Sequence, residues 1–170
     1  MVKKFLIIFI ILFMSLPAFA DVFNHPQKLS YIIQNLPEFN NIKCKFEQEK
    51  ALPGSNVILK SSGNFEFEKE KGIVFKTTFP VQSETNYNTD GYKQINDIIN
   101  AISNKNYGKI EAVFDFYFEQ KGGKWTLGLV PKKSKQPSKY IKSIEIEGEK
   151  NISMMKITTQ NSVVTKIRFY

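Results

Sequence analysis

The chain has 170 residues and a formal net charge of +8, with 24 basic against 16 acidic residues, one histidine and one cysteine. This length fits one domain with a sizeable hydrophobic core. A single cysteine excludes an internal disulfide, and a single histidine argues against His-based triads, two-His metal sites and zinc clusters. The positive charge fits an anionic membrane surface or an acidic partner, and equally a lysine-rich composition spread along solvent-facing positions.

The first twenty residues have the pattern of a secretory signal peptide. Two lysines precede the apolar run 5–16, and residues 18–20 include the small side chains that a signal peptidase accepts. The run is short for a membrane span. We therefore predict cleavage after Ala20, export to the periplasm, and a mature chain 21–170 that forms one domain.

The mature chain is predicted to begin with an amphipathic helix, which Pro26 opens within its first turn and Pro37 ends. A permanent place on a sheet and a role as the lid of a cavity explain this helix equally well. Its apolar residues follow helical spacing at Leu29, Ile32, Ile33 and Leu36.

Segments 42–52, 57–67 and 72–79 alternate apolar and polar residues, which is typical of β-strands with one face turned inward. Pro53-Gly54-Ser55-Asn56 predicts a turn between the first two strands. Gly63 permits a bend or a bulge in the second. In the first strand Cys44 alternates with apolar residues, which predicts a buried thiol.

The hairpin formed by the second and third strands has one strongly aromatic face. Phe65, Phe67 and Phe75 fall on this face, and Pro80 closes its exit. Large aromatic side chains are costly to leave in water. Either the protein's own core or an apolar ligand must therefore cover the face.

The middle of the chain is predicted to contain a strand over 82–87, a turn over 88–91 and a strand over 92–95 that pairs back. Asn96 or Asp97 then caps a second helix. The broad apolar face of this helix consists of Ile98, Ile99, Ala101 and Ile102. Residues 110–114, further along, fit either a helical turn or the start of a strand.

The C-terminal part of the chain predicts a run of hairpins. Strands over 114–119 and 125–129 are joined by the turn Lys121-Gly122-Gly123, and a basic loop over 132–138 follows. Three further strands lie around 144–146, 152–159 and 163–169. Together, these elements predict a mainly β domain with two or three helices. Its architecture is a strongly curved antiparallel sheet, or open half-barrel, lidded by amphipathic helices.

The sequence offers little catalytic chemistry. Gly122-Gly123-Lys124 fits a hairpin turn rather than a phosphate-binding loop. Basic and aromatic residues alternate onto opposite faces, which argues against nucleic-acid binding. We predict that the protein is not an enzyme and uses no cofactor or metal. The strand acids are predicted to face outward into solvent: Glu66, Glu68, Asp115, Glu119, Glu145 and Glu147.

Apolar binding is the remaining class of function. Aromatic rings on a concave sheet leave slots that suit acyl chains. Periodicity by itself, however, favours an ordinary packed core. The residues predicted to face inward are Phe46, Phe65, Phe67, Phe75, Phe79, Phe114, Phe116, Phe118 and Trp125.

The order of several motifs resembles that of the LolA-like periplasmic lipoprotein carrier family. In that family a Phe-x-Gln strand precedes a glycine, alternating apolar residues, a basic residue, an aromatic strand and a proline. The resemblance covers nearly the whole mature chain. The matching residues are Phe46, Gln48, Gly63, Phe65, Phe67, Lys69, Phe75 and Pro80, followed by Asp90, Gly91, Trp125, Leu127, Leu129, Pro131 and Lys132.

The resemblance implies an unclosed barrel whose helices lid a hydrophobic cavity for acyl chains. The family takes lipoproteins from an inner-membrane ABC-type lipoprotein-releasing transporter. It ferries them to an outer-membrane acceptor or to the membrane itself, and a monomer is expected. Alternatives are a carrier of another lipid or glycolipid, and a non-carrier envelope β domain that binds a protein.

Two residues depart from the family pattern and indicate a divergent member. Lys69 stands where the family usually has an arginine that latches the lid, and Phe75 stands where it often has tryptophan. Lysine lacks the planar five-donor guanidinium, so its latch would be weaker. The residues expected to line the acyl cavity are Leu29, Ile33, Phe46, Phe65, Phe67, Phe75, Phe116, Trp125 and Leu127.

Overall fold

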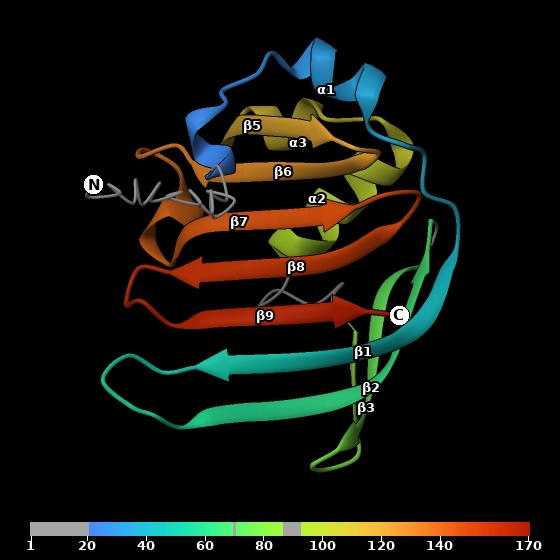
Figure 1. Ribbon diagram of the computed structural model, residues 1–170, viewed down its shortest axis with the longest axis vertical. Helices are drawn as coiled ribbons and strands as arrows, with labels where there is room; N and C mark the ends of the chain where they lie inside the picture. Colours follow the sequence, from blue (N-terminus) through green and yellow to red (C-terminus); the bar gives the residue numbers. More distant parts are fainter. Residues whose placement is uncertain (1–20, 70, 87–92) are drawn as a thin grey trace, which may run out of the picture.

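A computed structural model describes residues 21–69, 71–86 and 93–170 (Figure 1). The predicted signal peptide and the predicted turn 88–91 lie outside these residues. The strands are β1 (Ile42–Ala51), β2 (Ile58–Glu68), β3 (Gly72–Phe79), β4 (Ser83–Asn86), β5 (Phe114–Lys121), β6 (Lys124–Pro131), β7 (Ile141–Gly148), β8 (Ile152–Thr159) and β9 (Val164–Phe169). The helices are η1 (Val22–Asn24), α1 (Leu29–Asn35), α2 (Lys93–Asn104), α3 (Gly108–Glu111) and η2 (Gln136–Lys139), where η denotes a 3₁₀ helix.

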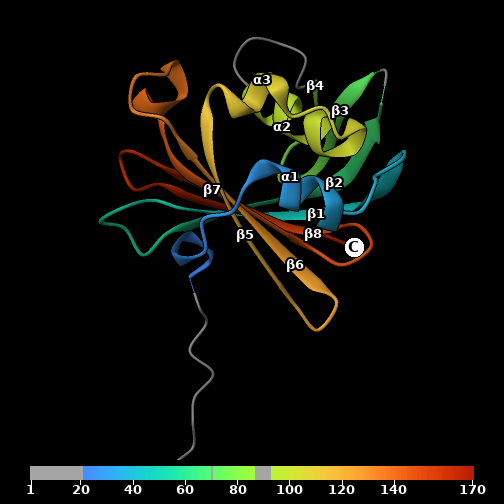
Figure 2. The same cartoon turned by 90° about the horizontal axis from the view of Figure 1, so that it is seen from above.

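All nine strands form one antiparallel sheet in the order β4-β3-β2-β1-β9-β8-β7-β6-β5. The sheet is curved and does not close, because β4 and β5 stand at opposite ends of this order. Helices α1, α2 and α3 gather on one side of it (Figure 2). These features confirm the predicted fold class of an open, curved antiparallel sheet covered by helices.

The bend predicted at Gly63 is present in β2. The pairing of β2 with β3 shifts register between Ser62 and Gly63. At Gly63 the neighbouring main chain comes so close that an added Cβ would lie 2.0 Å from the Lys76 carbonyl oxygen. Only a residue without a side chain permits this approach, so Gly63 sets the local curvature of the sheet.

The first helix begins later than the sequence predicts. Pro26 forms an isolated bridge with Tyr117 of β5, and α1 starts only at Leu29. The amide of Gln27 donates to the carbonyl of Phe116 at 3.2 Å, and the Phe118 amide donates to the His25 carbonyl at 3.0 Å. The segment is extended because it satisfies backbone groups at the free edge of β5.

The strand predicted over 92–95 is wrong, because α2 already includes Lys93. Asn96 consequently lies inside the helix as a buried residue rather than at its cap. The sequence repeats isoleucine at positions 95, 98, 99 and 102, and this helical period extends the helix toward its N-terminus. Residues 110–114 contain both of the predicted alternatives, a helical turn and the start of a strand. Helix α3 ends at Glu111, and β5 begins at Phe114.

Inward-facing residues of the sheet and the apolar face of α2 form one hydrophobic core. One aromatic residue predicted to face inward does not join it: Phe79 is 58 % exposed. Phe79 is the last residue of β3 and pairs with Ser62, on the far side of the bulge at Gly63. The bulge therefore breaks the regular alternation that placed Phe79 with Phe75.

Candidate functional site

The nine residues predicted to line an acyl cavity all lie in or against the single core. Leu29 and Ile33, on α1, are partly buried and pack against it. The other seven are buried, and each is at most 8 % exposed. They are Phe46, Phe65, Phe67, Phe75, Phe116, Trp125 and Leu127. The sequence thus predicted which residues share the interior, since strand alternation fixes which face each residue occupies.

One aromatic cluster lies where β1, β2, β3 and β9 meet. The ring centroids of Phe46 and Phe75 are 4.8 Å apart, and those of Phe65 and Phe75 are 5.0 Å apart, both edge to face. Phe169 lies 4.7 Å from Phe65. The pairing of β1 with β9 brings Phe169 from the C-terminal strand to this cluster. Phe169 joins the aromatic cluster only because β9 pairs with β1.

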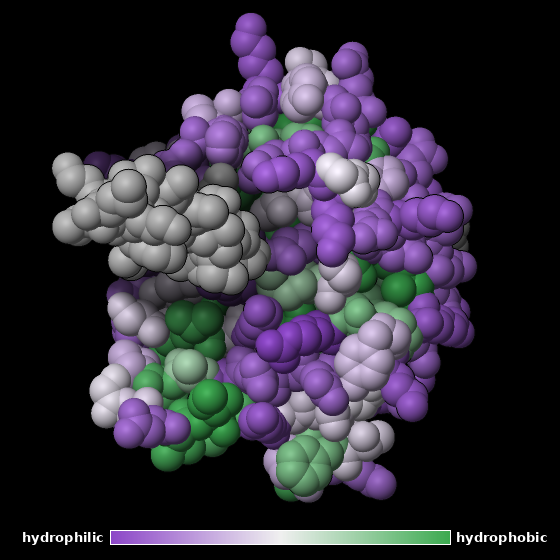
Figure 3. Space-filling model, viewed as in Figure 1, coloured by the Kyte–Doolittle hydropathy of each residue, from purple (hydrophilic) through white to green (hydrophobic). Residues whose placement is uncertain are grey.

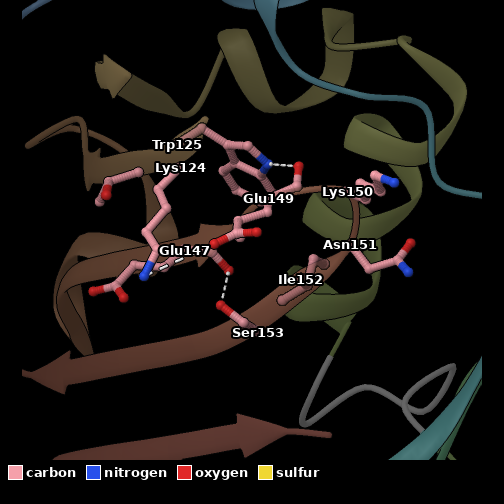
Figure 4. Close-up of a pocket in the computed structure, with 10 residues that line it drawn as sticks. Lys124, Trp125, Glu147, Glu149, Lys150, Asn151, Ile152 and Ser153 are labelled. Carbon is pink, nitrogen blue, oxygen red and sulfur yellow. Dashed lines mark hydrogen bonds and ion pairs between the residues drawn. The ribbon is translucent and has the colours of Figure 1, made fainter. Parts of the chain in front are cut away.

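Trp125 forms a second contact centre at the other end of the core. Its ring is 5.7 Å from that of Phe39, and its Nε1 donates to the carbonyl of Glu149 at 2.7 Å (Figure 4). Gly148 lies so close that a Cβ there would stand 2.4 Å from the Trp125 ring. The indole is therefore held by one hydrogen bond and by close contacts with Phe39 and Gly148.

Helix α2 supplies the cover of the concave face. Ile98, Ile99, Ala101 and Ile102 are each at most 5 % exposed and fill the space over the sheet. A pocket of about 370 Å³ lies beside Trp125 at the β7–β8 turn, and a groove of about 810 Å³ runs along the outer sheet face and η1. Neither is lined by α2, and the first reaches Trp125, one of the residues predicted to line the acyl cavity.

The inner face of α2 also carries polar groups that the sequence reasoning missed. Asn96, Asn100 and Ser103 succeed one another on α2 at intervals of four and three residues, which is helical spacing, and Tyr107 follows between α2 and α3. Within the described chain, Asn100 Oδ1 and the Tyr107 hydroxyl are buried without a hydrogen-bond partner. Burial raises the pKa of Tyr107 to about 12. These two oxygens can accept hydrogen bonds from a group that enters the core, and the phenol can also donate one.

The C-terminal end of α2 is fastened to the segment that joins α1 to β1. The hydroxyl of Ser103 donates to the carbonyl of Phe39 at 2.6 Å, and both residues are buried. Lys105 forms an ion pair with Glu38, with 3.4 Å between Nζ and Oε1. These contacts link the end of α2 to the loop between α1 and β1 rather than to the sheet.

Lys69, the predicted latch, lies in the exposed turn between β2 and β3. Among the residues that the structure describes, no hydrogen bond or ion pair joins it to a helix. The latch function of Lys69 stays a prediction. Ser103 and Lys105 make the contacts that fasten the end of α2 in the structure.

Replacing Ser103 with alanine is expected to lower the unfolding free energy by about 1–2 kcal/mol, because it leaves the buried Phe39 carbonyl without a donor. Amide hydrogen exchange in α2 should also accelerate. Ser153→Ala is the matched control, since its hydroxyl donates to the Glu147 carbonyl at 3.2 Å in an exposed setting. We expect a change within about 0.5 kcal/mol for that control. Equal effects of both substitutions in urea titrations would contradict a fastening role for Ser103.

The strand acids face outward, as predicted, and some of them form surface ion pairs. Glu145 lies 3.2 Å from Lys156, and Glu66 lies 3.0 Å from Lys76. Burial in the outer groove, and then the neighbouring Glu145, raise the pKa of Glu147. Cys44 is only half-buried, and burial raises the pKa of its thiol.

No protein-family model matches this sequence, and no curated protein matches it. Within the described residues, no three side chains of the metal-binding types are grouped closely enough to hold an ion. A search of the same part of the chain finds no helix with the length and apolarity that crossing a membrane requires.

Proposed function

We propose that this protein carries the acyl chains of a lipoprotein, or of another lipid, between its aromatic sheet face and a movable cover formed by α1 and α2. The observation that carries the proposal is the construction of the core. Its sheet side is lined with aromatic rings, and its other side is covered by an amphipathic helix that is fastened to the loop between α1 and β1.

Opening would proceed by displacement of α2. The Ser103 hydrogen bond and the Lys105–Glu38 ion pair would break, and acyl chains would replace the isoleucine side chains over Phe46, Phe65 and Phe75. An ion pair this exposed is worth at most about 1 kcal/mol, so it allows opening. Such a cover favours the empty closed state without locking it.

The unpartnered oxygens give the lipid an orientation. A buried polar group without a partner costs about 1–3 kcal/mol, which a hydrogen bond from cargo would recover. The Tyr107 hydroxyl can donate to an ester or amide carbonyl of a lipidated head group, and Asn100 Oδ1 can accept from its amide or hydroxyl. Acyl tails would then extend toward the aromatic cluster.

The free energy of burying acyl chains would set the direction in which the cargo moves. Each methylene buried contributes about 0.8 kcal/mol, so a multi-chain anchor does not enter water unaided at a useful rate. A carrier needs no higher affinity than a membrane, because loading is driven and unloading is downhill. As in the family it resembles, we propose a periplasmic monomer that an inner-membrane ABC-type transporter loads. An outer-membrane acceptor, or the membrane itself, would unload it.

Cross-linking the cover tests the proposal. In a Cys44→Ala background, Glu38→Cys and Lys105→Cys would be joined by a bis-maleimide that spans the present ion pair. We expect uptake of a fluorescent acyl probe to fall at least tenfold after cross-linking. A matched pair, Lys124→Cys and Glu149→Cys, replaces another exposed ion pair and should leave uptake unchanged.

Two outcomes would separate the hypotheses. Normal uptake by the cross-linked cover would overturn opening at α2. Absence of acyl species from the gently purified mature protein in native mass spectrometry, together with no binding of acyl probes, would overturn the carrier itself. That result would favour the second candidate, an envelope β domain that binds a protein, which a single buried hydrophobic core also fits.

A further inference from the structure

Three segments that are distant in sequence meet at one end of the sheet. Ala51, at the end of β1, pairs with both Ile58 and Val164, so the β1–β2 hairpin lies beside the β8–β9 turn. The side chain of Gln160 in that turn donates to the carbonyls of Ser138 and Ile141, at 3.0 and 3.2 Å. The loop before β7 therefore joins the same edge, at the left of Figure 1.

This edge is strongly basic. Segments 50–60, 132–142 and 159–166 contain eight lysines and no aspartate or glutamate, although the chain has 16 acids. Glu49 pairs with Lys60 at 3.3 Å, and Glu111 lies beside Lys132, whose ammonium donates to its carbonyl at 2.8 Å. No ion pair engages the other lysines of these segments within the described residues. The sequence suggested lysines spread along solvent faces, whereas the fold collects a third of all basic residues here.

The same edge exposes large apolar side chains. Val57, Ile58 and Leu59 are 57 %, 51 % and 51 % exposed, and Tyr140 is 65 % exposed. In Figure 3 an apolar patch marks the region of the β1–β2 hairpin at the lower left. Exposed apolar side chains beside several lysines are the combination that inserts into an interface between lipid and water.

We propose that this lysine-rich edge, defined by segments 50–60, 132–142 and 159–166, docks on the surface of an anionic phospholipid bilayer. The lysines contact the head groups. Val57, Leu59 and Tyr140 enter the boundary between head groups and acyl chains. The absence of acids across all three segments favours this occupant, because a lipid surface presents negative charge uniformly and needs no complementary pattern. The inference is independent of acyl cargo, since none of these residues belongs to the core.

Flotation with lipid vesicles tests the docking surface. Protein should float with vesicles that contain phosphatidylglycerol, should do so less at high salt, and should stay behind with pure phosphatidylcholine. Each lysine near an anionic surface contributes about a fivefold gain in partitioning. The triple variant Lys133→Gln, Lys135→Gln and Lys139→Gln is therefore expected to bind about a hundredfold more weakly. Val57→Ser with Leu59→Ser should also weaken binding.

The control removes three exposed lysines from the opposite end of the sheet: Lys121→Gln, Lys124→Gln and Lys150→Gln. An equal loss in this control would show that only net charge matters and would overturn the assignment of the edge. Failure of the wild-type protein to bind anionic vesicles would also overturn the assignment, even if the protein bound an acidic protein. Circular dichroism confirms that each variant is folded. Protein with the cross-linked cover should still bind vesicles, so failure of docking is distinguishable from failure of acyl uptake.

Discussion

Replacing Trp125 with alanine is expected to lower the unfolding free energy by about 3–5 kcal/mol, the range for truncating a fully buried aromatic residue. The indole is 1 % exposed, contacts Phe39, and donates to the Glu149 carbonyl. Because domains have about 5–15 kcal/mol of total stability, this variant should unfold at far lower urea concentration.

Two further substitutions make the Trp125 prediction specific. Trp125→Phe keeps most of the packing and loses the hydrogen bond, so we expect a loss of about 1–2 kcal/mol. Phe79→Ala truncates an aromatic residue that is 58 % exposed and should change stability by less than about 1 kcal/mol. A small effect at Trp125, or a large one at Phe79, would show that the core is packed differently.

Gly63→Ala should cost about 3 kcal/mol, at the upper end of the range for overpacking. The new Cβ would lie 2.0 Å from the Lys76 carbonyl oxygen and 2.9 Å from Thr77 Cα, and both are backbone atoms that a side-chain rotation cannot move. Relief requires β2 and β3 to separate at the bulge, which would also disturb Phe65 and Phe75 beside it.

The control for Gly63 is Gly108→Ala at the start of α3. An added Cβ there meets no atom closer than 3.9 Å, and alanine favours helix over glycine. We expect unchanged or slightly raised stability, measured by urea unfolding for both variants. If Gly63→Ala were as stable as wild type, the close approach of β2 and β3 at the bulge would be refuted.

The proposed carrier function and the proposed docking surface depend on two different apolar parts of the protein. The aromatic core packs against α2, which would have to move in the proposed carrier mechanism. The hairpin tip at Val57 and Leu59 is open already. A carrier that docks through the lysine-rich edge would keep α1 and α2 free to move while it is bound.

Local sequence patterns predicted most of the strands, and they failed where the structure of a segment depends on its pairing with a neighbouring strand. Alternation placed β1, β2, β3, β5 and β6 correctly, together with most of their inward residues. The local pattern predicts a helix from Pro26, because it carries no information about the free edge of β5 that binds the segment. Strand alternation predicts Phe79 in the core, and the register shift between Ser62 and Gly63 makes this prediction wrong.

The amino-acid sequence by itself determined the open, mainly β fold class and the set of aromatic residues that share its interior, because the face that a strand residue occupies follows from its position along the strand. Tertiary structure alone decided that α2 fills this interior and that Ser103 and Lys105 fasten it. It also decided that lysines from three remote segments form one edge. The physical reason is the same in each case: these contacts depend on which strands pair and on how a helix lies across them, and no local period encodes either.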